Sequence, residues 1–150
     1  MANKPERQNN IGILGEKTYH FALRIIKAYT YLRSKKVVIL SNQLLRSGTA
    51  IGANCREAIY AQSKADFISK LSISLKEASE TAYWLELLND SHYIENKSFE
   101  SVYGDCIEII KLLTSIISTT KDKYLSNNSS NDSQSGCNKG NTNSTPPHSC

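Results

Sequence analysis

The chain has 150 residues, of which 39% are hydrophobic and 21% charged, and its formal net charge is +4. This composition is typical of one small globular domain, and the absence of an apolar run of about 18 residues argues against a membrane span. The polar start, residues 1–10, lacks the apolar stretch of a signal peptide, so we expect a cytoplasmic protein.

Positive charge is concentrated at the start of the chain. Residues 1–36 hold eight Lys and Arg against two Glu, a net +6, whereas residues 37–150 hold ten Lys and Arg against twelve Asp and Glu. An anionic partner would explain this imbalance. A solvated helix face would explain it equally well.

Four helices are predicted in chain order, because residues 12–123 lack proline and repeat apolar residues at steps of three and four. Residues 1–11 are expected to be flexible, and the helices to cover 12–33, 35–62, 64–90 and 97–122. Ser34 is a candidate N-cap for the second helix. Ser63 and Asp66 form a candidate capping box for the third. The predicted inward residues of the four helices are Phe21, Ile25, Ala28, Tyr29 and Leu32; Val37, Leu44, Gly48, Ile51, Cys55 and Ala58; Ile68, Leu71, Leu75, Ala78, Ala82 and Leu85; and Phe99, Val102, Cys106, Ile109, Leu113 and Ile116.

Short connections make successive helices antiparallel neighbours, so the fold class is all-α: an up-down-up-down four-helix bundle over residues 12–123. Residues 124–150 are rich in Ser and Asn, and from 126 on they hold no large apolar residue. Such a segment cannot offset the entropy of ordering, and we expect a disordered tail.

Gly48 and Gly52 are separated by three residues, with no following Lys and no preceding strand, so they do not form a phosphate-binding loop. Pairing the second and third predicted helices antiparallel gives facing residues whose numbers add to 126. Gly48 then lies opposite Ala78, a close crossing that would justify a glycine within a helix. The same register places Arg46 by Glu80 and Glu57 near Lys70.

The third predicted helix has a second stripe, away from its inward seam, that includes Ile73, Trp84 and Leu87. An exposed apolar patch with a Trp is typical of an interface, so we predict a subunit contact at these residues. The alternative is that the first helix or the tail covers them.

A basic row with interleaved aromatic residues runs along the first predicted helix. Such a row suits phosphate contacts and base stacking, although a merely solvated face would look the same. The candidate nucleic-acid contacts are Lys17, Arg24, Lys27, Arg33, Lys35 and Lys36.

The cysteines and histidines form no recognisable catalytic or metal-binding set. Cys55 and Cys106 fall in apolar segments and are expected to be reduced core thiols. Cys137, His148 and Cys150 lie in the tail, and three ligands there are a weak metal signal. We therefore expect no enzyme activity, cofactor or metal.

Two stretches resemble the family of 23S rRNA-intervening sequence proteins: "QLLRSGTAIGANCREA" from Gln43 and "DFISKLSISLKEASETAYWLELL" from Asp66. "FALRIIKAY" extends the resemblance, which covers about residues 17–121; Cys55 departs from the family by replacing an Ile-like residue. The resemblance implies a homopentameric ring of four-helix bundles. It also implies kinship with the accessory variability protein of diversity-generating retroelements, which binds nucleic acid and a reverse transcriptase.

These observations together predict a non-enzymatic scaffold that binds RNA or DNA, or a ribonucleoprotein such as a reverse transcriptase. The main alternative is a protein–protein adaptor that does not bind nucleic acid.

Overall fold

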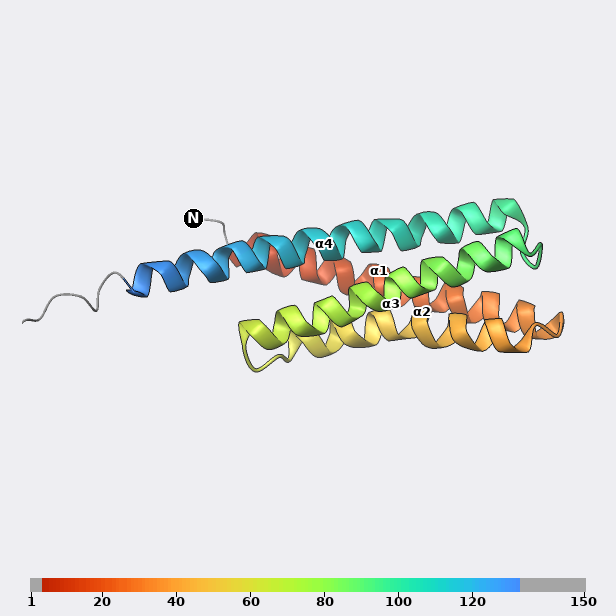
Figure 1. Cartoon of the computed structure of the whole chain (residues 1–150), viewed down its shortest axis with the longest axis horizontal. Helices are drawn as coiled ribbons and strands as arrows, with labels where there is room; N and C mark the ends of the chain where they lie inside the picture. Colours follow the sequence, from red (N-terminus) through yellow and green to blue (C-terminus); the bar gives the residue numbers. More distant parts are fainter. Residues whose placement is uncertain (1–3, 133–150) are drawn as a thin grey trace, which may run out of the picture.

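The computed structural model describes residues 4–132, which form four helices and no strand (Figure 1). They are α1 (Lys4–Ser34), α2 (Val38–Ile59), α3 (Lys64–Asp90) and α4 (Asn96–Asp132). The predicted all-helical fold class and the number of helices are confirmed.

Each helix packs against two others. α1 contacts α2 and α4, and α3 contacts the same two helices, whereas the described residues give no contact between α1 and α3 or between α2 and α4. The side chains most completely buried between the helices are mostly those that the apolar spacing predicts to face inward: Leu14, Phe21, Ile25, Leu32, Leu44, Ile51, Leu71, Leu85, Leu88, Ile109 and Leu113.

The outer bounds of the bundle differ from the prediction. α1 begins at Lys4 rather than at residue 12, and α4 continues to Asp132 rather than ending near 122. Pro5 is compatible with the first turn of a helix, where the missing N–H has no partner to lose. No Gly or Pro interrupts residues 105–132. The polar composition of the two ends therefore made the predicted first and fourth helices too short.

The turn between α1 and α2 corrects the predicted cap at Ser34. This residue is the last of α1, and its Oγ donates to the Tyr31 carbonyl at 2.6 Å. Lys36 has a φ of 63°, and the N–H groups of Lys36 and Val37 donate to Arg33 and Leu32. This pattern is a Schellman motif, which ends a helix through a left-handed residue. α2 starts after Val37 without a side-chain cap.

The predicted cap of α3 is confirmed. Ser63 is extended, and its Oγ accepts a hydrogen bond from the Asp66 N–H at 3.0 Å. The Asp66 carboxylate accepts from the Gln62 N–H at 3.2 Å rather than from Ser63 itself. The reciprocal arm of the capping box is therefore displaced by one residue.

Side chains across α2 and α3 follow the predicted register. Lys70 donates to Glu57 at 2.6 Å, Arg46 forms a short contact with Glu80, and the Ser74 Oγ donates to the Ile51 carbonyl at 2.9 Å. The residue numbers of these pairs add to between 125 and 127, and they rise along one helix as they fall along the other.

The atoms nearest to Gly48 belong to α1, a helix that the sequence did not pair with this residue. A Cβ added at Gly48 would lie 2.8 Å from both γ carbons of Ile25, so the glycine allows α1 to approach α2 closely. A Cβ at Gly52 would lie 3.4 Å from the Thr18 carbonyl oxygen, also in α1. Ala78 is fully buried in the core. The periodicity identified an inward residue but not which neighbour it meets.

Candidate nucleic-acid interface

Two residues of the basic row, Lys17 and Arg24, face α4. Lys17 donates to Glu108 at 2.9 Å, and this hydrogen bond raises the pKa of Lys17 and lowers the pKa of Glu108. Arg24 forms a short ion pair with Asp105 and also donates to the Ser101 hydroxyl at 2.8 Å. Two of the six predicted contact residues therefore already have partners on α4.

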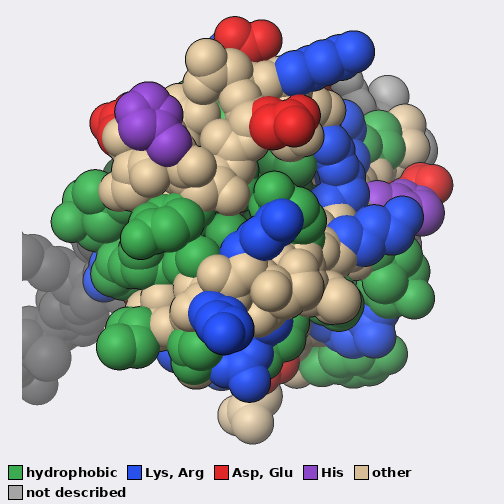
Figure 2. Space-filling model, turned by 90° about the vertical axis from the view of Figure 1, so that its right-hand side faces the viewer, with side chains coloured by type: hydrophobic (Ala, Val, Ile, Leu, Met, Phe, Trp, Pro, Cys, Tyr) green, Lys and Arg blue, Asp and Glu red, His purple; other side chains and the backbone are tan. Residues whose placement is uncertain are grey.

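The other four predicted cations lie in the C-terminal part of α1 and in the turn that follows it. Among the described side chains, residues 9–127, no salt bridge is formed by Lys27, Arg33, Lys35 or Lys36. Figure 2 looks onto this end of the molecule and shows Lys and Arg side chains gathered beside hydrophobic ones. We call these four residues the basic end.

Two tyrosines of α1 lie beside cations of the basic end. The Arg33 guanidinium lies 5.9 Å from the centre of the Tyr29 ring, and the Lys35 ammonium lies 5.8 Å from the centre of the Tyr31 ring. Tyr31 is 47% exposed. Cations beside an accessible aromatic ring can contact phosphates while a base stacks on the ring.

The predicted subunit-contact stripe on α3 is less exposed than expected. Ile73 is 39% exposed, but Trp84 and Leu87 are half-buried, and Trp84 packs against the core. The Trp84 Nε1 donates to the Glu80 carboxylate at 3.0 Å. Hydrogen bonds lower the pKa of Glu80, and the one from Arg46 has a larger effect than the one from Trp84. This polar cluster fixes the edge of the indole.

Another apolar stripe, on the outer face of α1, was missed from the sequence. Tyr19, Leu23 and Ile26 are each between 42% and 53% exposed. Their spacing of four and three places them on one face. The same spacing rule that found the α3 stripe could have found this one. Tyr19 also lines a groove between α1 and α2, together with Ala22 and Ala53.

The two cysteines of the described helices are buried thiols. Cys55 and Cys106 are free and buried as predicted, and burial raises the pKa of Cys106 to about 12. Among the side chains of residues 9–127, no three His, Cys, Asp or Glu residues are grouped to hold a metal ion. Within residues 4–132, no helix is apolar over enough length to cross a bilayer. The tail residues Cys137, His148 and Cys150 lie outside the described part.

These features define an all-helical protein of four packed helices with a basic end. The sequence profile of the 23S rRNA-intervening sequence protein family matches residues 13–115, and the chain belongs to this family. The predicted resemblance is thus confirmed.

A solved structure supports the same assignment. It is the crystal structure of a protein of unknown function from the S23 ribosomal protein family of Bacteroides thetaiotaomicron VPI-5482. The two sequences are 51% identical, the TM-score is 0.71, and the match covers 73% of this chain and 98% of the other. No curated protein matches the chain.

Proposed function

We propose that the chain is a non-enzymatic, cytoplasmic scaffold that binds RNA or DNA through its basic end. The observation that carries the proposal is that no salt bridge with a described residue is formed by four cations in the last turns of α1 and the turn after it, namely Lys27, Arg33, Lys35 and Lys36. Unpaired cations release the counterions of a phosphate backbone on binding, and this release is the main source of affinity for nucleic acids.

The proposal gives Lys17 and Arg24 a lesser role than the sequence alone did. Their partners Glu108 and Asp105 would have to be displaced before either cation could meet a phosphate. We assign them to the contact between α1 and α4. The resemblance extends the possible partners to a ribonucleoprotein such as a reverse transcriptase.

We also propose that copies of this antiparallel, up-down-up-down bundle assemble into a ring, the pentamer that the family resemblance implies. Two apolar stripes support this assembly, one on α1 (Tyr19, Leu23 and Ile26) and one on α3 (Ile73, Trp84 and Leu87). α1 and α3 are not adjacent helices of the bundle, so the stripes are separate surfaces. A contact that joins two different surfaces is heterologous and closes into a ring when the rotation allows. A ring would repeat the basic end in every subunit and add avidity.

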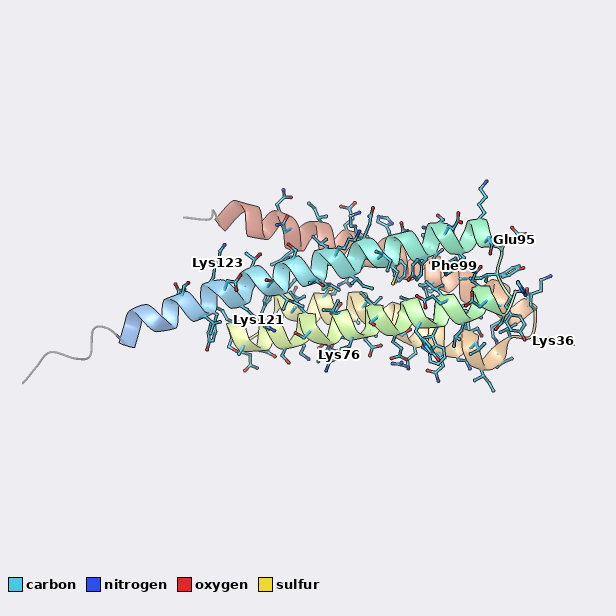
Figure 3. All side chains as sticks on the ribbon, turned by 45° about the horizontal axis from the view of Figure 1, so that its top comes forward. Lys36, Lys76, Glu95, Phe99, Lys121 and Lys123 are labelled. Atoms are coloured by element: carbon cyan, nitrogen blue, oxygen red, sulfur yellow. The ribbon has the colours of Figure 1, made fainter. Side chains whose placement is uncertain are left out.

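The test is the salt dependence of binding to a short oligonucleotide, measured by fluorescence anisotropy. Four phosphate contacts per chain predict a slope of log affinity against log salt of about −3, or roughly a fiftyfold loss between about 50 and 200 mM salt. Replacing Lys27, Lys35 and Lys36 together by Gln should reduce the slope by about 2. Replacing Lys76, Lys121 and Lys123 by Gln gives the matched control, because it removes the same number of charges at positions away from the basic end (Figure 3).

A flat salt dependence, or equal losses for the test and control variants, would reject nucleic-acid binding at the basic end. The exposed apolar stripe on α1 would then favour the alternative function, a protein–protein adaptor.

A further inference from the structure

A groove opens between α1 and the start of α4, next to the basic end. Its α1 side is formed by Arg24, Lys27, Ala28 and Tyr31. Its other side holds residues from the α3–α4 connection and the first turns of α4, namely Ile94, Glu95, Lys97, Ser98, Ser101 and Val102. Polar groups thus surround an apolar strip.

The groove separates charge from apolar surface. Lys27 and Lys97 form no salt bridge with a described residue, whereas Arg24 is held by Asp105 and Ser101. Ile94 and Val102 are partly buried against the core and give an apolar floor. A phosphate can bind to the unpaired ammonium groups, and the flat face of a base can pack against the apolar floor.

Tyr31 adds an aromatic wall. Tyr31 is 47% exposed, and the Lys35 ammonium lies 5.8 Å from the centre of its ring. Stacking of a base on an aromatic side chain is available to unpaired bases, since paired bases are already stacked within a duplex. A groove that only followed a duplex backbone would need cations but no apolar floor.

We propose that this groove binds one nucleotide of a single-stranded nucleic acid, with the phosphate at Lys27 and Lys97 and the base against Tyr31 and Val102. The inference rests on the proposed function and narrows it from nucleic acid in general to single strands. Glu95 on the rim weakens the attraction for phosphate, because its carboxylate carries the same sign of charge.

The experiment compares three probes of equal length on the full chain: a single-stranded oligo(dT), a duplex, and an abasic strand that keeps the phosphates but lacks the bases. We expect the oligo(dT) to bind at least about fivefold more tightly than the abasic strand, because stacking on an aromatic side chain contributes about 1–3 kcal/mol per base. Tyr31→Leu should remove this difference, while Tyr83→Leu, at an exposed Tyr on α3, should preserve it.

Two further variants test the charges. Lys97→Gln should weaken binding of all single strands, and Glu95→Gln should strengthen it, each by about two- to fivefold. Far-UV circular dichroism and the unfolding midpoint verify that each variant folds.

The outcomes separate this inference from the broader proposal. Equal, salt-dependent binding of all three probes that does not respond to Tyr31→Leu would overturn the nucleotide groove and leave the basic end as a phosphate-binding surface. Absence of binding to every probe would overturn both.

Discussion

At the scale of single residues, Gly48 is the position where the fold tolerates no side chain. A Cβ there would meet both γ carbons of the buried Ile25 at 2.8 Å, and these atoms belong to a stiff β-branched side chain. Overpacking of this kind costs about 1–3 kcal/mol. We therefore expect Gly48→Ala to lower the free energy of unfolding, measured by urea denaturation, despite the better helix propensity of Ala.

Gly104 provides the matched control. It is an exposed residue inside α4, and a Cβ added there would have no neighbour within 4 Å. Gly104→Ala should raise the free energy of unfolding by up to about 1 kcal/mol through helix propensity alone. If both variants gained stability, Gly48 would not mark a close approach of α1.

At position 92, the backbone conformation determines which amino acid is most favourable. Its φ of 60° places it in the left-handed region, and the N–H groups of His92 and Tyr93 donate to Asn89 and Leu88, as in a Schellman motif. A side chain in this conformation costs about 1–2 kcal/mol. We expect His92→Gly to raise the melting temperature, with a gain of about 0.5–1 kcal/mol after the entropy cost of glycine.

The same substitution at His20 tests whether backbone conformation is the cause. His20 is exposed in the middle of α1, so His20→Gly should lower stability by about 1 kcal/mol. A loss of stability in both variants would contradict the role given to His92.

At the scale of helices, the sequence predicted some contacts and not others for identifiable reasons. Three- and four-residue spacing gives the inward face of a helix. The short connection between the second and third helices then sets their register, in which the numbers of facing residues add to about 126, and the pairs Arg46–Glu80 and Glu57–Lys70 follow from it. Spacing does not say which neighbours fill that face, and so the close approach of Ile25 in α1 to Gly48 was not predicted.

The candidate site shows the same limit. The basic row of α1 was evident, but its acidic partners Asp105 and Glu108 are about 80–90 residues away in α4 and cannot be paired by local pattern. The turn at Lys36 was missed because no Gly marks its left-handed residue.

Arg46 joins α2 to α3 through Glu77 and Glu80. Because the pKa of Glu80 is lowered in the folded chain, its contribution to stability is complete above the unfolded pKa of about 4.3 and is lost as the pH falls through the lower folded pKa. Side chains this exposed contribute about 1 kcal/mol at most. We expect Glu80→Gln to be less stable than the wild type at pH 6, with a difference that shrinks toward pH 3.

The measurement is a series of urea denaturation curves at several pH values. Glu100→Gln is the control, because Glu100 is exposed and forms no salt bridge with a described residue. Its stability should follow the wild-type pH profile. Parallel profiles for Glu80→Gln and the wild type would show that the Arg46 contact does not stabilise the fold.

At the scale of the whole molecule, the two apolar stripes make a prediction about assembly. If the α1 stripe of one chain meets the α3 stripe of the next, then charging either stripe blocks self-association. We expect wild-type chains to sediment well above 16.7 kDa and both Leu23→Glu and Ile73→Glu to sediment near this monomer mass. Both positions are partly exposed in the single chain, so the folded bundle should persist in each variant.

Mixing the two variants distinguishes a heterologous contact from a symmetric one. The Leu23→Glu chain retains its α3 stripe, and the Ile73→Glu chain retains its α1 stripe, so one of each can pair but no third chain can join. Sedimentation of the mixture should therefore show a species of about twice the monomer mass that neither variant forms alone. A symmetric contact between like stripes would instead leave at least one variant associated on its own, and a monomeric wild type would remove the ring altogether.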